Sequence, residues 1–195
     1  MPNCRDESDE INCQILVLKQ GYNKNVSPIN SDNPIVHVSI SMDLLRLVDI
    51  NEPDYSIEIQ FEIMLKWKEN RATYNNLKTE EALNALTEAD IKKLWLPEVI
   101  YENTDQKDST RLGGTWEWKT NVVVRREQEN GGTMRGLEFI DETEFFSGSE
   151  NSLIMNQSYT RTFQCIYRLA HYPFDTQVFK FKRLPKAQQT LRHSH

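Results

Sequence analysis

The 195-residue sequence lacks most of what a membrane-spanning or catalytic chain needs. No apolar run approaches the roughly 20 residues that cross a bilayer, and no charged-then-apolar segment at the start resembles a signal peptide. Four histidines and three cysteines are present, but no His-x-x-x-His, Cys-x-x-Cys or Gly-x-Ser-x-Gly spacing occurs. We therefore expect neither a pore within this chain nor an enzyme.

Positive charge is also scarce relative to negative charge. The sequence has 23 Lys and Arg against 29 Asp and Glu, a net charge of −6, and its basic residues are interleaved with acids. Binding to nucleic acid needs a concentrated basic surface, so we expect no nucleic-acid partner. Acidic pairs such as Asp141-Glu142 are expected to be solvated surface charges.

Alternation of apolar and polar residues is the clearest structural pattern in the sequence. From Tyr55 to Trp67 the odd positions are apolar and the even positions are mostly polar, which predicts a half-buried antiparallel strand. Residues 36–43 alternate in the same way, and residues 49–54, which include Pro53, predict a turn. We therefore expect the two strands to form a long hairpin.

Shorter elements are predicted along the rest of the chain. Thr87, followed by Asp90 and an apolar run, predicts a capped helical turn, and residues 79–86 are a second candidate. Further strands are predicted at residues 121–124, 137–139, 152–164 and 176–182, with turn signals at 113–114, 130–132 and 147–149. Short strands with such turns favour an all-β fold, an immunoglobulin-like two-sheet β-sandwich.

One turn resembles the defining loop of a known family. Cys165 is followed by Tyr172-Pro173-Phe174-Asp175 and, one residue later, by Gln177. The segment is similar to the gating loop of Cys-loop ligand-gated ion channels, whose Phe-Pro-Phe-Asp-x-Gln tip transmits agonist binding to the membrane domain. Phe179 stands where that family has its second cysteine. The resemblance therefore implies a loop without its disulfide, and we expect Cys165 to be a buried free thiol.

Three other stretches resemble the same family in the same order. They are Trp67-Lys-Glu-Asn-Arg71, Leu94-Trp-Leu-Pro-Glu98 and the stretch from Leu18 to Pro28. The last of these is similar to the short N-terminal helix and the turn that precede the first strand in the family. The resemblance implies an extracellular ligand-binding domain with a short N-terminal helix.

The resemblance also implies domain limits. We expect the receptor-type domain over residues 14–182 and an aberrant or disordered tail over residues 183–195, because the sequence no longer follows the family after Lys182. The final strands and the pore helices would then be missing. The sandwich is thus expected to be C-terminally incomplete, and the membrane to be reached only through missing segments.

Residues 1–13 carry a second resemblance. The run Cys4-Arg-Asp-Glu-Ser-Asp9-Glu10-Ile-Asn-Cys13 is similar to the end of an LDL-receptor class A module, in which paired carboxylates hold calcium. It implies Asp9 and Glu10 as ligands of a vestigial calcium site, and we expect no other cofactor. The alternative is a disordered acidic terminus.

In the resembling family, agonists bind between neighbouring subunits of a pentamer. Carried over by spacing, one face of this site falls at Tyr101, Glu102 and Asn103. The opposing face falls at Glu62, Met64, Ile154, Asn156 and Ser158. The family often has an aromatic residue where Glu62 and Glu102 stand, so we do not expect an aromatic cage for a quaternary amine. The two carboxylates either attract a cation directly or are solvated.

These features together predict the extracellular domain of a channel subunit, which couples binding of a small-molecule agonist to opening of a pore in the cell membrane. Two glycosylation sequons, at Asn25 and Asn156, agree with an extracellular location. Two alternatives remain: a soluble small-ligand-binding protein of the same fold, and an adhesion-type β-sandwich linked to an LDL-receptor-like module. Four apolar helices encoded downstream would favour the channel.

Overall fold

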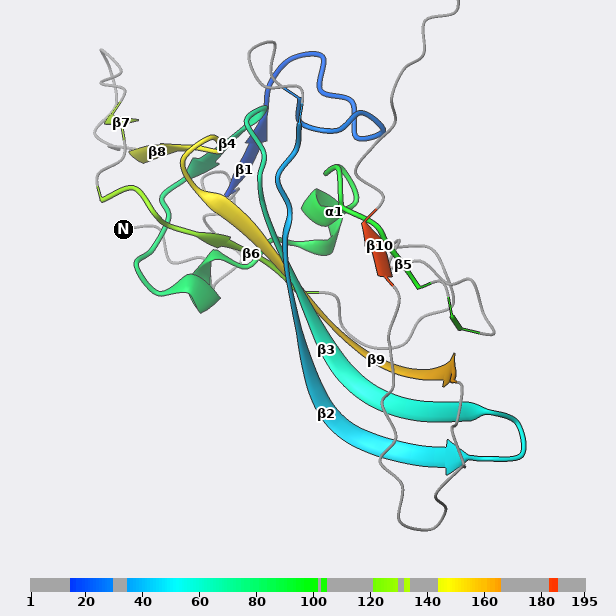
Figure 1. The fold of residues 1–195 in the computed structure, drawn as a ribbon. Coiled ribbons are helices and arrows are strands. Elements are labelled where there is room, and N and C mark those ends of the chain that lie inside the picture. Colours follow the sequence, from blue (N-terminus) through cyan, green and yellow to red (C-terminus); the bar gives the residue numbers. More distant parts are fainter. Residues whose placement is uncertain are drawn as a thin grey trace, which may run out of the picture. The chain divides into compact units, whose positions relative to one another are not determined.

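The computed structural model describes residues 15–29, 35–101, 103–104, 121–129, 132–133, 144–165 and 183–185. Within these ranges the regular structure is almost entirely β-strand, arranged in antiparallel sheets (Figure 1). One sheet has the strand order β1 (Leu16–Leu18), β4 (Ala72–Asn75), β8 (Glu144–Ser147), β7 (Gly132–Thr133). A second sheet pairs β10 (Arg183–Pro185) with β5 (Val99–Tyr101). A third has the strand order β2 (Ser39–Asn51), β3 (Ser56–Lys68), β9 (Ser152–Gln164), β6 (Asn121–Arg125). The expected all-β sandwich class is confirmed.

β3 supplies much of the core. Its odd positions from Ile57 to Trp67 are at most 3% exposed, whereas its even positions reach the surface to varying degrees. Apolar side chains at every second residue place one face of the strand inward. The period-2 prediction for this segment is confirmed.

β2 and β3 form the expected hairpin, but β2 is far more exposed than β3. The turn between them is closed by Asn51, whose Nδ2 donates to Asp54 Oδ2 at 2.8 Å and whose Oδ1 accepts from the Asp54 N–H at 3.2 Å. Tyr55 follows in a left-handed conformation, with φ 52°. β2 runs past the predicted 36–43, and its residues 43–50 are all exposed although several are Leu, Val or Ile.

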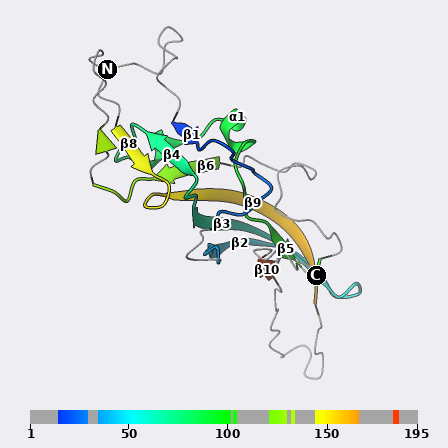
Figure 2. The same ribbon diagram turned by 90° about the horizontal axis from the view of Figure 1, so that it is seen from above.

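The chain divides into two compact units. Unit 1 comprises Met1–Ser39, Leu65–Trp95 and Asn121–Met155, and unit 2 comprises Ile40–Met64, Leu96–Thr120 and Asn156–His195. In unit 1, β4 pairs with β1 on one side and with β8 on the other, so that Tyr74 lies opposite both Leu16 and Phe146 (Figure 2). All three side chains are buried.

A strand takes the place of the N-terminal helix over the residues that the structure describes. The run from Ile15 to Leu18 contains β-branched residues, which favour strands, and its exposure alternates: Leu16 is buried while Val17 is 42% exposed. The helix expected in this stretch was therefore wrong from residue 15 onward. Residues 1–14 lie outside the described ranges.

The two short helical segments of unit 1 follow the predicted positions. A 3-10 helix spans Glu81–Asn84, and α1 spans Glu88–Ile91. Thr87 caps α1: its Oγ1 accepts from the Asp90 N–H at 3.2 Å and donates to Asp90 Oδ2 at 2.9 Å. Asn84 closes the preceding loop, because its Nδ2 donates to the carbonyls of Lys78 and Val124.

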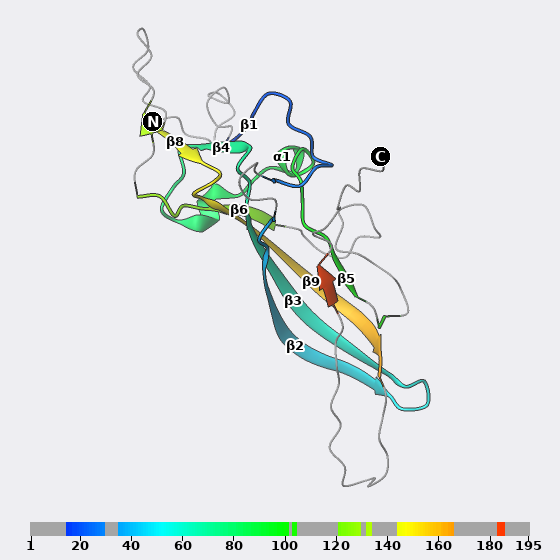
Figure 3. The ribbon, with the colours of Figure 1, turned by 45° about the horizontal axis from the view of Figure 1, so that its top comes forward.

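In unit 2, β5 pairs with β10, so that Arg183 lies opposite Tyr101 (Figure 3). β10 extends regular structure three residues into the segment where we expected a tail. The strands predicted at 137–139 and 176–182, and the turn at 113–114, lie outside the described residues.

Candidate ligand-binding face

Two of the recognised motifs meet at a buried carboxylate in unit 1. Glu69 is fully buried. The Arg71 guanidinium donates two parallel hydrogen bonds to its carboxylate, from Nε to Oε1 and from Nη2 to Oε2, each 2.8 Å long. Arg71 Nη1 also donates to the carbonyl of Val26 at 2.8 Å, in the turn that precedes the first long strand. A bidentate Arg-carboxylate pair fixes both geometry and charge.

Tyr22 brings the remaining motif into contact with this pair. Its hydroxyl donates to Glu69 Oε2 at 3.1 Å and accepts from the Trp95 N–H at 2.7 Å, and its ring centre lies 4.5 Å from the Arg71 guanidinium carbon. Burial is the main reason that the pKa of Tyr22 is raised to about 12. We call Tyr22, Glu69, Arg71 and Trp95 the Glu69 cluster. Its polar groups satisfy one another, so it holds the fold together.

Unit 2 contains the exposed part of the predicted ligand face. On β9, the Ser158 Oγ donates to Glu62 Oε1 of β3 at 2.8 Å. Met64, two residues after Glu62 on β3, and Asn156, two residues before Ser158 on β9, are exposed. Side chains two residues apart share one face of a strand. We call Glu62, Met64, Asn156 and Ser158 the outer face.

The other predicted contact residues lie elsewhere. Ile154 is 1% exposed, in unit 1, and Tyr101 is 3% exposed. The Tyr101 ring packs edge-on against Phe61 and Phe163, with centroids 5.7 and 5.8 Å apart. Asn103 bonds to Gln164, accepting from its N–H at 2.7 Å and donating from Nδ2 to its carbonyl at 3.2 Å. Glu102 lies outside the described residues. The structure thus brings together four of the predicted residues on one face, where Glu62, Met64 and Asn156 are exposed and Ser158 is half-buried.

Only the first residue of the predicted gating loop is described. Cys165 is a free thiol, half-buried rather than buried as expected, and burial raises its pKa. Its N–H donates to the Tyr55 carbonyl at 2.7 Å, which ties the start of the loop to the β2–β3 turn. No pattern in the sequence indicates this bond. Tyr172, Pro173, Phe174, Asp175 and Gln177 lie outside the described residues, as do Asp9 and Glu10.

The two sequon asparagines are both exposed. Asn25 lies in a turn, where its N–H donates to Asn23 Oδ1 at 2.9 Å. Asn156 lies on β9, within the outer face. A glycan on Asn156 would cover Glu62 and Ser158, whereas one on Asn25 would lie in unit 1.

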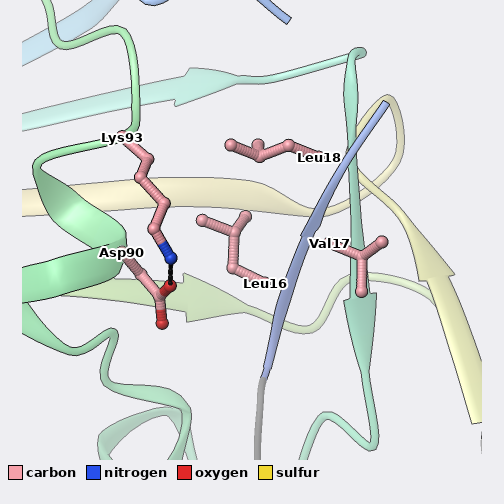
Figure 4. A pocket seen from close by; sticks show the side chains of 5 residues that line it. All are labelled: Leu16, Val17, Leu18, Asp90 and Lys93. Carbon is pink, nitrogen blue, oxygen red and sulfur yellow. Dashed lines mark hydrogen bonds and ion pairs between the residues drawn. The ribbon is translucent and has the colours of Figure 1, made fainter. Parts of the chain in front are cut away.

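A small cavity of about 180 Å³ lies in unit 1. Leu16, Val17 and Leu18 line one side, and the ion pair of Asp90 with Lys93, 3.1 Å long, lines the other (Figure 4). Asp90 also accepts from Thr87, so its carboxylate is committed to the helix cap. None of the candidate ligand-binding residues lines this cavity.

In the part of the chain that the structure describes, no helix is long and apolar enough to cross a bilayer. The same residues contain no group of three or more His, Cys, Asp or Glu side chains placed to hold a metal ion.

Comparison of the sequence with known proteins places the chain in a family. Residues 14–184 match the family model described as the neurotransmitter-gated ion-channel ligand binding domain. The chain is 28% identical over 127 residues to the neuronal acetylcholine receptor subunit beta-4 of Homo sapiens, covering 63% of this chain and 24% of that protein. For the Rattus norvegicus beta-4 subunit the values are 24% over 172 residues, 86% and 28%.

A third relative is the acetylcholine receptor subunit delta of Gallus gallus, 29% identical over 89 residues, which are 45% of this chain and 17% of the relative. The chain thus spans between 17% and 28% of the length of these three relatives. They are receptor subunits and not enzymes. The chain belongs to the neurotransmitter-gated ion-channel ligand-binding domain family.

Proposed function

We propose that this chain is the extracellular domain of a channel subunit whose outer face contacts a small ligand at the boundary with a neighbouring subunit. The observation that carries the proposal is the Ser158–Glu62 hydrogen bond, which fixes a carboxylate on an exposed strand face. Tyr101, Glu102 and Asn103 belong to the opposite side of the site in a second subunit. Related subunits in a pentamer are the expected partners.

A chimeric receptor tests this assignment. Residues 14–184 replace the matching region of the human beta-4 subunit, and single cysteines are introduced by Asn156→Cys, Met64→Cys and, as a control in unit 1, Lys78→Cys. We expect agonist to slow modification at the first two positions by a charged thiol reagent, measured as current loss, and to leave the control unchanged. Equal rates with and without agonist at all three positions would contradict a ligand on the outer face.

Occupancy of the two sequons provides an independent check. Mass spectrometry of secreted chain is expected to find Asn156 without a glycan, because a sugar there would block the outer face. Full occupancy at Asn156 would rule the ligand site out.

Gating is proposed to pass through residues 165–177. Alanine replacement of Tyr172, Pro173, Phe174 and Asp175 in the chimera is expected to lower the maximal current while agonist affinity, measured by radioligand binding, is retained. Unchanged maximal currents would contradict this role.

Residues 1–13 are proposed as the remnant of an LDL-receptor class A module. The family match begins only at residue 14, which supports a boundary there. Calcium takes six to eight oxygen ligands, so Asp9 and Glu10 by themselves are expected to bind it more weakly than about 1 mM, the weak end for extracellular modules. Calorimetric titration with calcium, repeated on D9N/E10Q, measures this. A micromolar site lost in the double variant would show that the calcium site is functional.

A further inference from the structure

Glu62 keeps one carboxylate oxygen open on the outer face. Its Oε1 accepts from Ser158 Oγ at 2.8 Å, and among the described residues its Oε2 has neither a hydrogen-bond nor an ion-pair partner. The side chain is exposed. A neutral hydroxyl orients the carboxylate without cancelling its charge, so Oε2 can accept a hydrogen bond from a cation.

Basic side chains of the same two strands are occupied elsewhere. On β3, Lys66 contacts Glu127 Oε1 at 2.7 Å, and Lys68 approaches Glu127 Oε2 at 3.8 Å. On β9, the Arg161 guanidinium carbon lies 5.2 Å from the centre of the Tyr159 ring. Within its own chain, then, Glu62 has no counter-ion among the residues that the structure describes.

Aromatic rings are absent from the outer face as far as β3 and β9 are described in unit 2. Phe61, Tyr159 and Phe163 are buried, and the Phe61 ring centroid lies 5.7 Å from that of Tyr159 and 6.0 Å from that of Phe163. A quaternary ammonium group is bound best by the faces of exposed aromatic rings, which these residues do not offer. The neighbours of Glu62 on this face are instead Met64 and Asn156.

We propose that Glu62, positioned by Ser158, selects a ligand that carries a protonated primary amine over one that carries a quaternary ammonium group. A primary ammonium has N–H donors for Oε2, and the resulting bond is charge-assisted. A quaternary group has no N–H and gains only the weaker attraction between solvated charges. The inference rests on the proposed function, because it takes the outer face to be the ligand site.

Two small probes of matched charge test the selection. The ¹⁵N-labelled 195-residue chain is titrated with methylammonium chloride and with tetramethylammonium chloride at equal ionic strength, while the amide signals of Asn156 and Ser158 are followed by NMR. We expect methylammonium to bind about fivefold more tightly, the range of an exposed ion pair. Equal affinity for the two cations would overturn this inference alone. If neither cation moved these signals, the proposed function would fall with it.

Matched variants assign the preference to individual side chains. Glu62→Gln keeps an acceptor for Ser158 but removes the charge, so the fivefold preference is expected to vanish. Glu58→Gln removes a charge from the same side of β3 and is expected to keep it. A preference that survives in E62Q, or that E58Q abolishes equally, would show that Glu62 is not the selecting group.

Ser158 is a positioning residue, and its role needs a readout other than stability. Ser158→Ala is expected to reduce the preference to about twofold, because the carboxylate then samples several rotamers. Ser158→Thr retains the hydroxyl and is expected to restore about fivefold. Urea midpoints equal to that of the parent chain establish that both variants are folded. An unchanged preference in S158A would overturn the positioning role.

Discussion

Two glutamates on neighbouring stretches of chain have opposite surroundings. Glu69, just after β3, is fully buried, and both of its oxygens are bound by Arg71 and Tyr22. Glu62, within β3, is exposed, and one hydroxyl binds one of its oxygens. A buried carboxylate must have all its partners within the fold, whereas an exposed one can leave an oxygen to water or to a ligand. The same residue type therefore supports structure in unit 1 and is available for recognition in unit 2.

The largest effect should come from removing the Glu69 charge. Glu69→Gln leaves the Arg71 guanidinium without its counter-ion, and breaking a buried pair typically costs about 3–5 kcal/mol of unfolding free energy. Glu62→Gln should change it by less than about 0.5 kcal/mol, as for most exposed positions. Urea unfolding measures both.

Glu81→Gln is the control for loss of an ion pair alone. Glu81 pairs with Arg125, and both side chains are partly exposed. Such pairs contribute about 0–1 kcal/mol. Equal losses in E69Q and E81Q would erase the contrast between buried and exposed carboxylates.

The next effect should come from the turn that packs on the backbone beside Glu69. A Cβ on Gly148 would lie 2.1 Å from the Glu69 carbonyl oxygen and 2.8 Å from that of Ala72. Because both obstacles are backbone, Gly148→Ala should destabilise by about 1–3 kcal/mol, the usual range for overpacking.

Gly21→Ala separates crowding from backbone conformation. Gly21 has φ +79° with open space around it, so alanine there meets conformational strain of about 1 kcal/mol and no clash. Thermal or urea unfolding of the two variants gives the comparison. A smaller loss of unfolding free energy for G148A than for G21A would mean that the backbone near Glu69 shifts at little cost to accommodate the added methyl group.

The elements of the Glu69 cluster were visible in the sequence, but their convergence was not. The motifs around Tyr22, Glu69 and Trp95 were each recognised, yet the bonds that join them span 47 and 73 residues, and no local pattern encodes such contacts. The Thr87 cap and the alternation of β3 were predicted correctly because both depend on neighbouring residues.

Unit 2 shows what spacing alone leaves open. Tyr101 was assigned to the ligand face by its distance along the chain from a motif, whereas β5, which was not predicted, buries the Tyr101 side chain within its own chain. Glu62 and Ser158 were assigned by spacing in the same way, and their side chains do form a hydrogen bond. The assignment succeeded here because the long strands β3 and β9, which carry these residues, were both predicted. Where the strand was known, the orientation of its side chains followed.

Alkaline pH should destabilise the Glu69 cluster through Tyr22. Burial raises its pKa to about 12, so the folded state favours the protonated phenol. The stabilisation linked to this group is complete below the unfolded pKa of about 10 and is lost as pH rises from about 10 to 12. Urea midpoints measured across that interval should fall less steeply for Tyr22→Phe than for the parent chain.

Tyr159, whose pKa burial also raises, titrates in both proteins and so cancels in this comparison. Tyr22→Phe should be less stable at pH 7, because the Trp95 N–H and Glu69 each lose a bond. Parallel curves for the two proteins above pH 10 would show that Tyr22 does not titrate with unfolding.

The smallest effect concerns the thiol of Cys165, the residue that follows β9. Burial raises its pKa, so a smaller fraction is thiolate at pH 8 than for a free cysteine, and only the thiolate reacts. In a C4S/C13S background, we expect a thiol-specific disulfide reagent to react about three- to tenfold more slowly with the folded chain than with the chain in urea. A rate equal to that in urea would contradict a shielded thiol.

Since the bond from the Cys165 N–H to the Tyr55 carbonyl involves only backbone, Cys165→Ala should leave the urea midpoint nearly unchanged. Stability at this end of unit 2 would then depend on main-chain bonding, in contrast to the charged side chains that hold unit 1.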